Sequence, residues 1–253
     1  MKAVFAALAL AVFSTPAFAA EVTLIGPGGV RAAVTALIPG FEKASGHTVK
    51  ATFGSGGGTK ARVIKGDAFD VPIVQPPLEP VVASGHVLKE SETPLAIAPI
   101  AVAVKAGAAK PDISTAEAVK KMLLAAKSIA YPNVEGNPAG GAAGISINET
   151  LAKLGIADTM KTKIKPAATG FATAKMVASG EAEIGIVFLS EMIHEPGITI
   201  VGNLPRDIST PTQLIGFVSA HAKDATAARS LLAYLSGPEA AAVYRDKGMV
   251  PGR

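Results

Sequence analysis

Residues 52–60, with the sequence TFGSGGGTK, bring together the residue types that bind small anions. Glycine lets the backbone approach a ligand closely, and the hydroxyls of Ser55 and Thr59 can donate hydrogen bonds to the oxygens of an anion. The stretch is not a phosphate loop, because that motif ends in lysine followed by serine or threonine, whereas here Thr59 precedes Lys60. It also lacks the G-x-G-x-x-G spacing of a dinucleotide site, as do residues 26–31.

Residues that could support catalysis or hold a metal are scattered along the chain. There is no cysteine, no G-x-S-x-G motif and no H-x-x-x-H pair. The four histidines are His47, His86, His194 and His221. Glu191 and Glu195 flank His194, but they follow an apolar strand pattern and are typical of a solvated turn rather than of a ligand set. We therefore expect no catalytic residue, no bound metal and no cofactor, with a secreted hydrolase or transferase as the less favoured alternative.

The chain alternates between strand and helix patterns. Strands are predicted over residues 21–25, 48–53, 69–74, 128–131, 184–189, 198–201 and 214–219. Helices are predicted over 31–43, 61–64, 115–126, 145–154, 172–179 and 226–235, and a capping box at 236–239 opens a last helix that Gly248 closes. Pro72 within the third strand indicates an edge position or a bulge. The alternation predicts an α/β fold with mostly parallel sheets.

Glycine-rich loops precede three of the predicted helices, at residues 26–29, 54–58 and 140–144. Each loop joins a strand to a helix, so it is not a linker between domains. The free N–H groups and the dipole at a helix N-terminus favour anions, and ligands of open α/β sheets bind at the carboxyl ends of strands. We interpret these loops as an anion cradle, with simple tight turns as the alternative. Arg31, in the first turn of its helix, is either a cation facing a larger anion or a solvated side chain.

The N-terminus predicts export. Residues 1–19 contain a short basic start, an apolar run and an A-x-A cleavage signal, which is the layout of a secretory signal peptide. A formal net charge of +4, spread along 253 residues, gives no basic patch of the kind that binds nucleic acid. No later stretch has the apolar length of a membrane span. We expect a periplasmic protein with a small anionic ligand and no nucleic-acid partner.

The mature chain resembles the periplasmic molybdate-binding protein family of ABC transporters, within the type II periplasmic solute-binding proteins. The resemblance covers nearly all of the mature chain and depends on the order and spacing of FGSGGGTKARVIKGDAFDVPI, AAGISINETLAKLG, ASGEAEIGIVFLSE and SGPEAAAVYRDKGMVPG. It implies two lobes, about 20–97 with 209–253 and 98–208, joined by crossovers near 96–102 and 204–212. It also implies a monomer that closes on a molybdate- or tungstate-like oxyanion, which would hold any metal present. The monomer would then dock on an ABC permease in the inner membrane, with a ligand-sensing membrane receptor as the alternative partner.

The same resemblance assigns ligand-binding residues. The family's two loop serines fall at Gly29, next to Gly28, and at Gly57 or Gly58, near Ser55 and Thr59; its amide donors fall at Ala143 and Gly170, and its tyrosine at Phe188. This chain therefore lacks two serine hydroxyls and a phenol. Each absent donor weakens a buried anion site by about 1–3 kcal/mol. A larger anion such as a small carboxylate is the alternative ligand, and Thr59→Val is expected to weaken binding of the true one.

Overall fold

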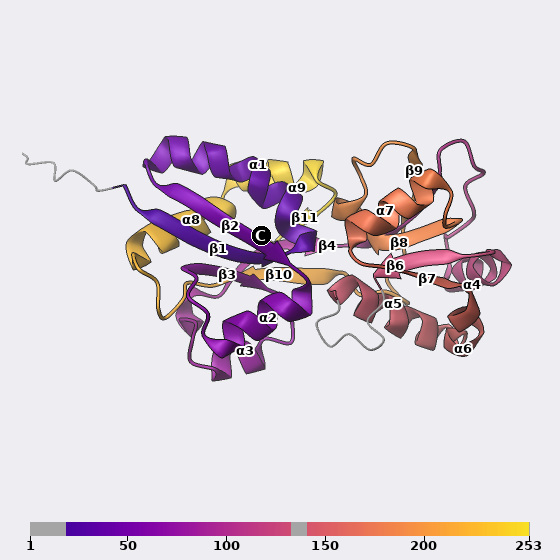
Figure 1. Cartoon of the computed structure of the whole chain (residues 1–253), viewed down its shortest axis with the longest axis horizontal. Helices are drawn as coiled ribbons and strands as arrows, with labels where there is room; N and C mark the ends of the chain where they lie inside the picture. The colour runs from indigo at the N-terminus through magenta and orange to yellow at the C-terminus, as the bar shows by residue number, and fades with distance from the viewer. Residues whose placement is uncertain (1–18, 133–140, 253) are drawn as a thin grey trace, which may run out of the picture.

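The computed structural model describes residues 19–132 and 141–252, which form two lobes, each a β-sheet flanked by helices (Figure 1). The strands of the first lobe lie in the order β11-β4-β10-β3-β1-β2, and those of the second in the order β7-β6-β8-β5-β9. The first sheet is drawn from residues 21–98 and 212–251, and the second from residues 100–203. The chain therefore leaves the first lobe once and returns to it once.

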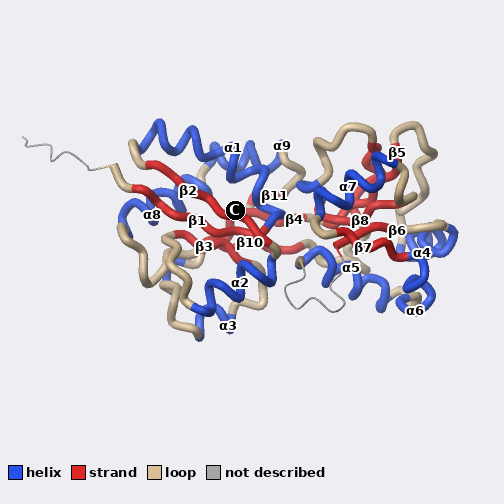
Figure 2. Tube along the Cα trace, viewed as in Figure 1, coloured by secondary structure: helices blue, strands red, loops and turns tan. Residues whose placement is uncertain are grey.

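The first lobe begins with strand–helix units. β1 (Glu21–Pro27) leads to α1 (Gly28–Ser45), β2 (Thr48–Gly54) leads to α2 (Gly56–Lys65), and β3 (Val71–Val74) leads to α3 (Glu79–Ala83). The lobe is completed by the 3-10 turn η1 (Lys89–Ser91), β4 (Thr93–Ala98), β10 (Thr212–Gly216), α8 (Ala225–Leu235), α9 (Pro238–Asp246) and β11 (Val250–Pro251). Helices α1 and α9 lie on one side of the sheet, and α2 and α3 lie on the other (Figure 2).

The second lobe has the same layered arrangement. Its elements are β5 (Ile100–Lys105), α4 (Ala116–Ala125), β6 (Ile129–Pro132), α5 (Ala142–Lys153), α6 (Ala157–Met160), the 3-10 turn η2 (Lys161–Lys163), β7 (Ile164–Ala167), α7 (Gly170–Ser179), β8 (Ile184–Phe188), the 3-10 turn η3 (Leu189–Glu191) and β9 (Ile198–Asn203). Helix α7 covers one face of the sheet and α5 the other (Figure 2). No helix of the described residues combines the length and apolar character needed to cross a bilayer.

Both sheets are mixed, so the prediction of mostly parallel sheets holds only in part. β1 pairs in parallel with β2 and β3, and β6 pairs in parallel with β7 and β8. The antiparallel pairs involve β4, β5, β9 and β10, the strands next to the two crossovers between lobes. A parallel pair requires a crossover connection back over the same sheet, and these strands enter or leave their sheet directly from the other lobe.

The glycine stretches are first turns of helices rather than loops. α1 starts at Gly28 and α2 at Gly56, each several residues before the predicted start, and α5 starts at Ala142. Gly140, which the third predicted loop includes, lies outside the described residues. Glycine has a low intrinsic helix propensity, so the sequence pattern places the helix start too late, while packing of the apolar face forms the helix from its first turn. In α1 that buried face includes Val30, Val34 and Leu37.

Two further local predictions are wrong. Ser236 does not cap α9, because its hydroxyl donates to the carbonyl of Ala233 at 3.1 Å and Gly237 is the residue at the N-cap. Pro72 lies in an interior strand, since β3 is placed between β1 and β10. The strand tolerates proline because Pro72 takes part through its carbonyl, which accepts a hydrogen bond from the amide of Phe217 at 2.9 Å.

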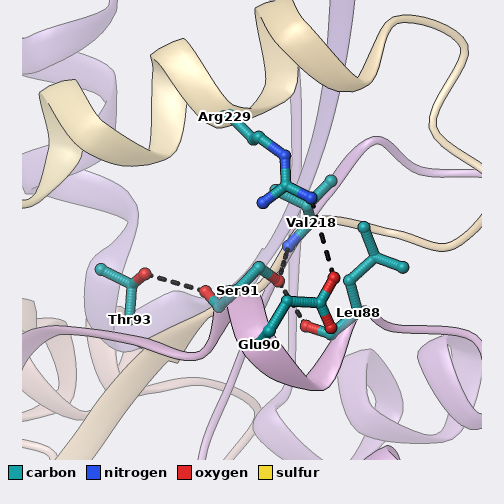
Figure 3. Close-up of polar contacts among 6 residues, drawn as sticks. All are labelled: Leu88, Glu90, Ser91, Thr93, Val218 and Arg229. Atoms are coloured by element: carbon teal, nitrogen blue, oxygen red, sulfur yellow. Dashed lines mark hydrogen bonds and ion pairs between the residues drawn. The ribbon is translucent and has the colours of Figure 1, made fainter.

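The segment before the first crossover is fixed to the first lobe by polar contacts (Figure 3). The amide of Val218 donates to Ser91 Oγ at 2.8 Å, and Thr93 Oγ1 donates to the carbonyl of Ser91 at 2.8 Å. An exposed ion pair joins Arg229 of α8 to Glu90 at 3.7 Å. These contacts hold the start of β4 in place against the first lobe. Pro99 is the single residue between the end of β4 and the start of β5, which belongs to the other lobe.

Candidate functional site

A cavity of about 200 Å³ lies between the two lobes, at the point where four helices begin. The first residues of α1 and α2 line it from the first lobe, and those of α5 and α7 line it from the second. N–H groups at a helix start have no partner within the helix and carry the positive end of its dipole. Four such starts facing one cavity favour an anionic ligand.

Two of these helix starts carry a hydroxyl. Ser55 Oγ accepts a hydrogen bond from the amide of Gly58 at 3.1 Å, and Thr169 Oγ1 accepts one from the amide of Ala172 at 3.1 Å. Both residues line the cavity. A hydroxyl that accepts from its own helix still has its hydrogen to donate, so each can bind an oxygen of the ligand. Helices α1 and α5 begin at Pro27 and Gly141 without a side-chain cap, which leaves their first amides as donors.

Most of the residues predicted from sequence do line this cavity. They are Gly28, Gly29, Arg31, Ser55, Ala143, Gly170 and Phe188. Gly57 lines a neighbouring cavity, and Gly58 and Thr59 line neither. Thr59 is 2% exposed, and its hydroxyl donates to the carbonyl of Gly26 at 3.2 Å. Thr59 thus joins the first turn of α2 to the end of β1.

Gly29 and Phe188, two of the departures from the family pattern, pack against each other. A Cβ added to Gly29 would lie 3.1 Å from Phe188 Cδ2, which is tighter than ordinary van der Waals contact. The hydroxyl of Ser190, two residues beyond Phe188, donates to the carbonyl of Gly29 at 2.8 Å. Gly29 and Phe188, which replace the family's serine and tyrosine, therefore belong to one packing arrangement. In it the start of α1 lies directly against the segment around η3.

Glu191 is buried in the cleft, so the prediction of a solvated turn is wrong for it. The residue is 8% exposed and lines the cavity. A Cβ on Gly28 would lie 2.9 Å from its Oε1, and a Cβ on Gly170 would overlap the carboxyl group. Within the described residues, the structure shows no hydrogen bond or ion pair to this carboxyl. Burial raises the pKa of Glu191 to about 7, because the charged form is poorly solvated there.

The other members of that sequence cluster face elsewhere. His194 is exposed, and its Nε2 lies 3.1 Å from Lys247 Nζ of α9. Among residues 19–132 and 141–252, no three side chains of the His, Cys, Asp and Glu types are grouped as metal ligands would be. Glu191 therefore differs from His194 in exposure, and it lines the cavity between the lobes whereas His194 does not.

Several lining residues were not predicted from the sequence as ligand-binding, and of these Glu191 and Gln75 carry the strongest chemistry. Thr169, Phe53 and Phe171 were also missed. Gln75 directly follows β3, and Glu191 lies three residues after the end of β8. A polar residue just past the carboxyl end of a buried strand was the available signal, since such strand ends face ligands in open α/β sheets.

Comparisons with known proteins agree with a ligand cavity between two lobes. Residues 22–250 match the family model described as bacterial extracellular solute-binding protein. The chain belongs to this family. The predicted two-lobe α/β fold and the resemblance to molybdate-binding-type periplasmic proteins are both confirmed.

The relatives differ in the activity that their names state. Aconitate isomerase of Pseudomonas sp. is 34% identical over 96% of this chain and 94% of its own length. Molybdate-binding protein ModA of Azotobacter vinelandii is 28% identical over 96% of this chain and 94% of its own length. The solved structure of the Azotobacter vinelandii periplasmic molybdate-binding protein has a TM-score of 0.75 and 23% identity, covering 92% of this chain and all of that one. That structural likeness concerns the fold.

Proposed function

We propose that the chain is the periplasmic, monomeric solute-binding component of an ABC importer and that its cleft binds a small organic carboxylate. The observation that carries this ligand class is the mixed character of the cavity wall. Four helix starts and the Arg31 guanidinium attract negative charge. Three aromatic side chains, Phe53, Phe171 and Phe188, present apolar surface to the same cavity. A carbon skeleton that ends in carboxylates satisfies both parts of this wall.

A tetrahedral oxyanion, the ligand named for the ModA relative, fits the cavity less well. It has no apolar surface to place against the aromatic rings. At Gly29 and Phe188 it finds no hydroxyl, and each absent donor weakens binding by about 1–3 kcal/mol.

Titration calorimetry and thermal unfolding of the mature chain test the ligand class. Molybdate, tungstate and sulfate would be compared with mono-, di- and tricarboxylates, aconitate among them. A ligand at 100 times its Kd stabilises the folded state by about 2.7 kcal/mol, which is easily measured. We expect this stabilisation from a carboxylate and not from the oxyanions. Stabilisation by the oxyanions alone would overturn the proposal.

Export and transport belong to the same proposal. We expect cleavage close to Ala20, recovery of the mature chain from the periplasm, and elution as a monomer in size-exclusion chromatography. Deleting the gene that encodes this chain should abolish uptake of the ligand by the host cell without affecting passive entry. Unchanged uptake in the deletion strain would argue against the transport role even if the ligand binds.

Binding without chemical turnover is the simpler reading, but one observation favours a second candidate, the isomerisation of an unsaturated polycarboxylate. The 34% identical relative is named aconitate isomerase. A general base acts best when its pKa lies near the working pH. Burial raises the pKa of Glu191 to about 7, and its carboxyl faces the cavity between Gly28 and Gly170.

The chemistry that Glu191 can supply is a proton shift. Its carboxylate takes a proton from a carbon next to the C=C bond, and the electron pair of that C–H bond spreads over the allyl unit and the adjoining carboxylate. The protonated Glu191 then returns the proton to either end of the allyl unit, which moves the double bond or restores it after rotation. No oxidant or other reactant is consumed. The amides at the helix starts stabilise the negative charge that develops on the carboxylate.

Proton NMR in D₂O separates the two candidates. Turnover of aconitate would appear as interconversion of isomers with deuterium incorporation at the allylic carbon. Glu191→Gln should abolish both signals while ligand binding persists, and Glu195→Gln, in the same segment but outside the cavity lining, should retain them. A wild-type chain that binds aconitate and shows neither exchange nor conversion is a binding protein without this activity.

A further inference from the structure

A second cavity, of about 400 Å³, adjoins the one between the helix starts. Gly56, Gln75 and Ala142 line both cavities and so form the partition between them. Past this partition the second cavity is bounded by residues of α2 and α5 and by the segment that leads into β10. The cleft therefore continues beyond the volume that a small ligand needs.

The partition contains a buried polar group without a partner. Gln75 is 3% exposed, and within the described residues its Nε2 is the buried side-chain nitrogen that makes no hydrogen bond. A Cβ on Gly56 would overlap Gln75 Oε1, so glycine at this helix start is what leaves room for the amide. A buried amide N–H without an acceptor is unfavourable, and native proteins rarely keep one unless a ligand or a water completes it.

The second cavity also has its own cation. Lys60, in the second turn of α2, lines it, and its Nζ donates to the carbonyl of Pro77 at 3.1 Å. Partial burial lowers the pKa of Lys60, and the nearby Glu79 opposes that shift. Glu149 of α5 lines the same cavity with an exposed side chain. An ammonium has two further N–H donors beyond the bond to Pro77, so Lys60 can bind an anion there.

We propose that this second cavity is a subsite for the distal carboxylate of an elongated polycarboxylate, which the Gln75 amide contacts at the partition and the Lys60 ammonium contacts beyond it. The subsite rests on the proposed carboxylate-binding function, because the proximal carboxylate of the same ligand occupies the first cavity. It makes the ligand class narrower: two carboxylates joined by a chain of carbons that is long enough to reach from the first cavity to the second.

The test compares a mono- and a polycarboxylate of matched skeleton by titration calorimetry in wild type, Gln75→Met and Lys60→Met. A hydrogen bond to a charged group corresponds to about ten- to hundredfold in Kd. We expect each substitution to raise the Kd of the polycarboxylate by that factor and the Kd of the monocarboxylate by less than about threefold. Lys65→Met is the matched control, since it removes the same charge from an exposed position of the same helix that lines neither cavity.

Two further variants distinguish the loss of a ligand contact from the loss of the fold. Gln75→Glu places a like charge at the partition and should weaken the polycarboxylate more than Gln75→Met does, with thermal unfolding confirming that both variants are folded. Glu149→Gln removes a negative charge that repels the distal carboxylate, so it should lower the Kd of the polycarboxylate. If wild type binds no carboxylate, the proposed function itself fails. If it binds both ligands and the variants at Gln75 and Lys60 keep wild-type affinities, the function stands and the subsite is wrong.

Discussion

Helices α2 and α7 begin at a hydroxyl-bearing cap, Ser55 and Thr169, whereas α1 and α5 begin at Pro27 and Gly141 without any side-chain cap. Each lobe contributes one start of each kind to the cleft. The capped starts use one amide internally and offer a hydroxyl, while the uncapped starts offer their amides directly. Each lobe thus contributes one helix start of each donor type to the cavity between the lobes.

Glu191 lies between one start of each kind, and substitutions there should have the largest effect. A methyl group on Gly170 would overlap the Glu191 carboxyl, so Gly170→Ala should lower the free energy of unfolding by about 1–3 kcal/mol. Gly141→Ala is the matched control, because a Cβ there meets nothing within 4 Å and the backbone angles suit alanine. Urea unfolding of both variants checks this. Equal losses of stability would show that glycine is needed at these starts for a reason other than Glu191.

The helix starts also show which features of the fold and the cleft could be predicted from the sequence. The alternation of strands, glycines and apolar helix faces was enough to predict the βα units and to locate the cleft at the helix starts, because these are local patterns. The sequence pattern places Glu191 in a solvated turn because its burial depends on two helix starts, Gly28 of α1 and Gly170 of α7, that are not its neighbours in the chain. The contact between Gly29 and Phe188 is equally non-local. The division of the chain into lobes at residues 97 and 208, and the roles of individual ligand-binding residues, stay predictions.

Titration of Glu191 gives the next prediction, with an effect of about 2 kcal/mol. Its folded-state pKa of about 7 lies above the value of about 4.3 for an unfolded glutamate, so the folded state holds its proton more tightly. The corresponding stability is present below pH 4 and is lost as the pH rises through 7. Glu191→Gln stays uncharged, so between pH 5 and pH 8 it should lose about 2 kcal/mol less of its free energy of unfolding than wild type.

Urea unfolding at several pH values measures this difference. Glu195→Gln, which changes a carboxyl outside the cavity lining, should follow the wild-type curve. Parallel pH profiles for wild type and Glu191→Gln would mean that the Glu191 carboxyl is better solvated than its burial implies.

The two capped starts predict effects of about 1 kcal/mol. Ser55→Ala and Thr169→Ala each remove a cap that accepts an amide hydrogen bond at 3.1 Å, which should reduce stability by about 1 kcal/mol. Glycine at an N-cap lowers stability by only a few tenths of a kcal/mol, so Ser55→Gly separates the cap from the ligand contact. If the hydroxyl binds the ligand, Ser55→Gly should keep its stability and still lose affinity in titration calorimetry. Unchanged affinity would show that the Ser55 hydroxyl does not bind the ligand.

Thr59→Val predicts the smallest effect on the site and separates residues that build a helix start from residues that face the ligand. Sequence alone suggested that this change weakens binding, since Thr59 adjoins the triple glycine. In the structure its hydroxyl donates to the Gly26 carbonyl at 3.2 Å, and the residue lines neither cavity. Loss of that buried bond should reduce stability by about 1 kcal/mol and leave Kd within about twofold. A clear loss of affinity at unchanged stability would return Thr59 to the cleft and place the ligand deeper between α1 and α2.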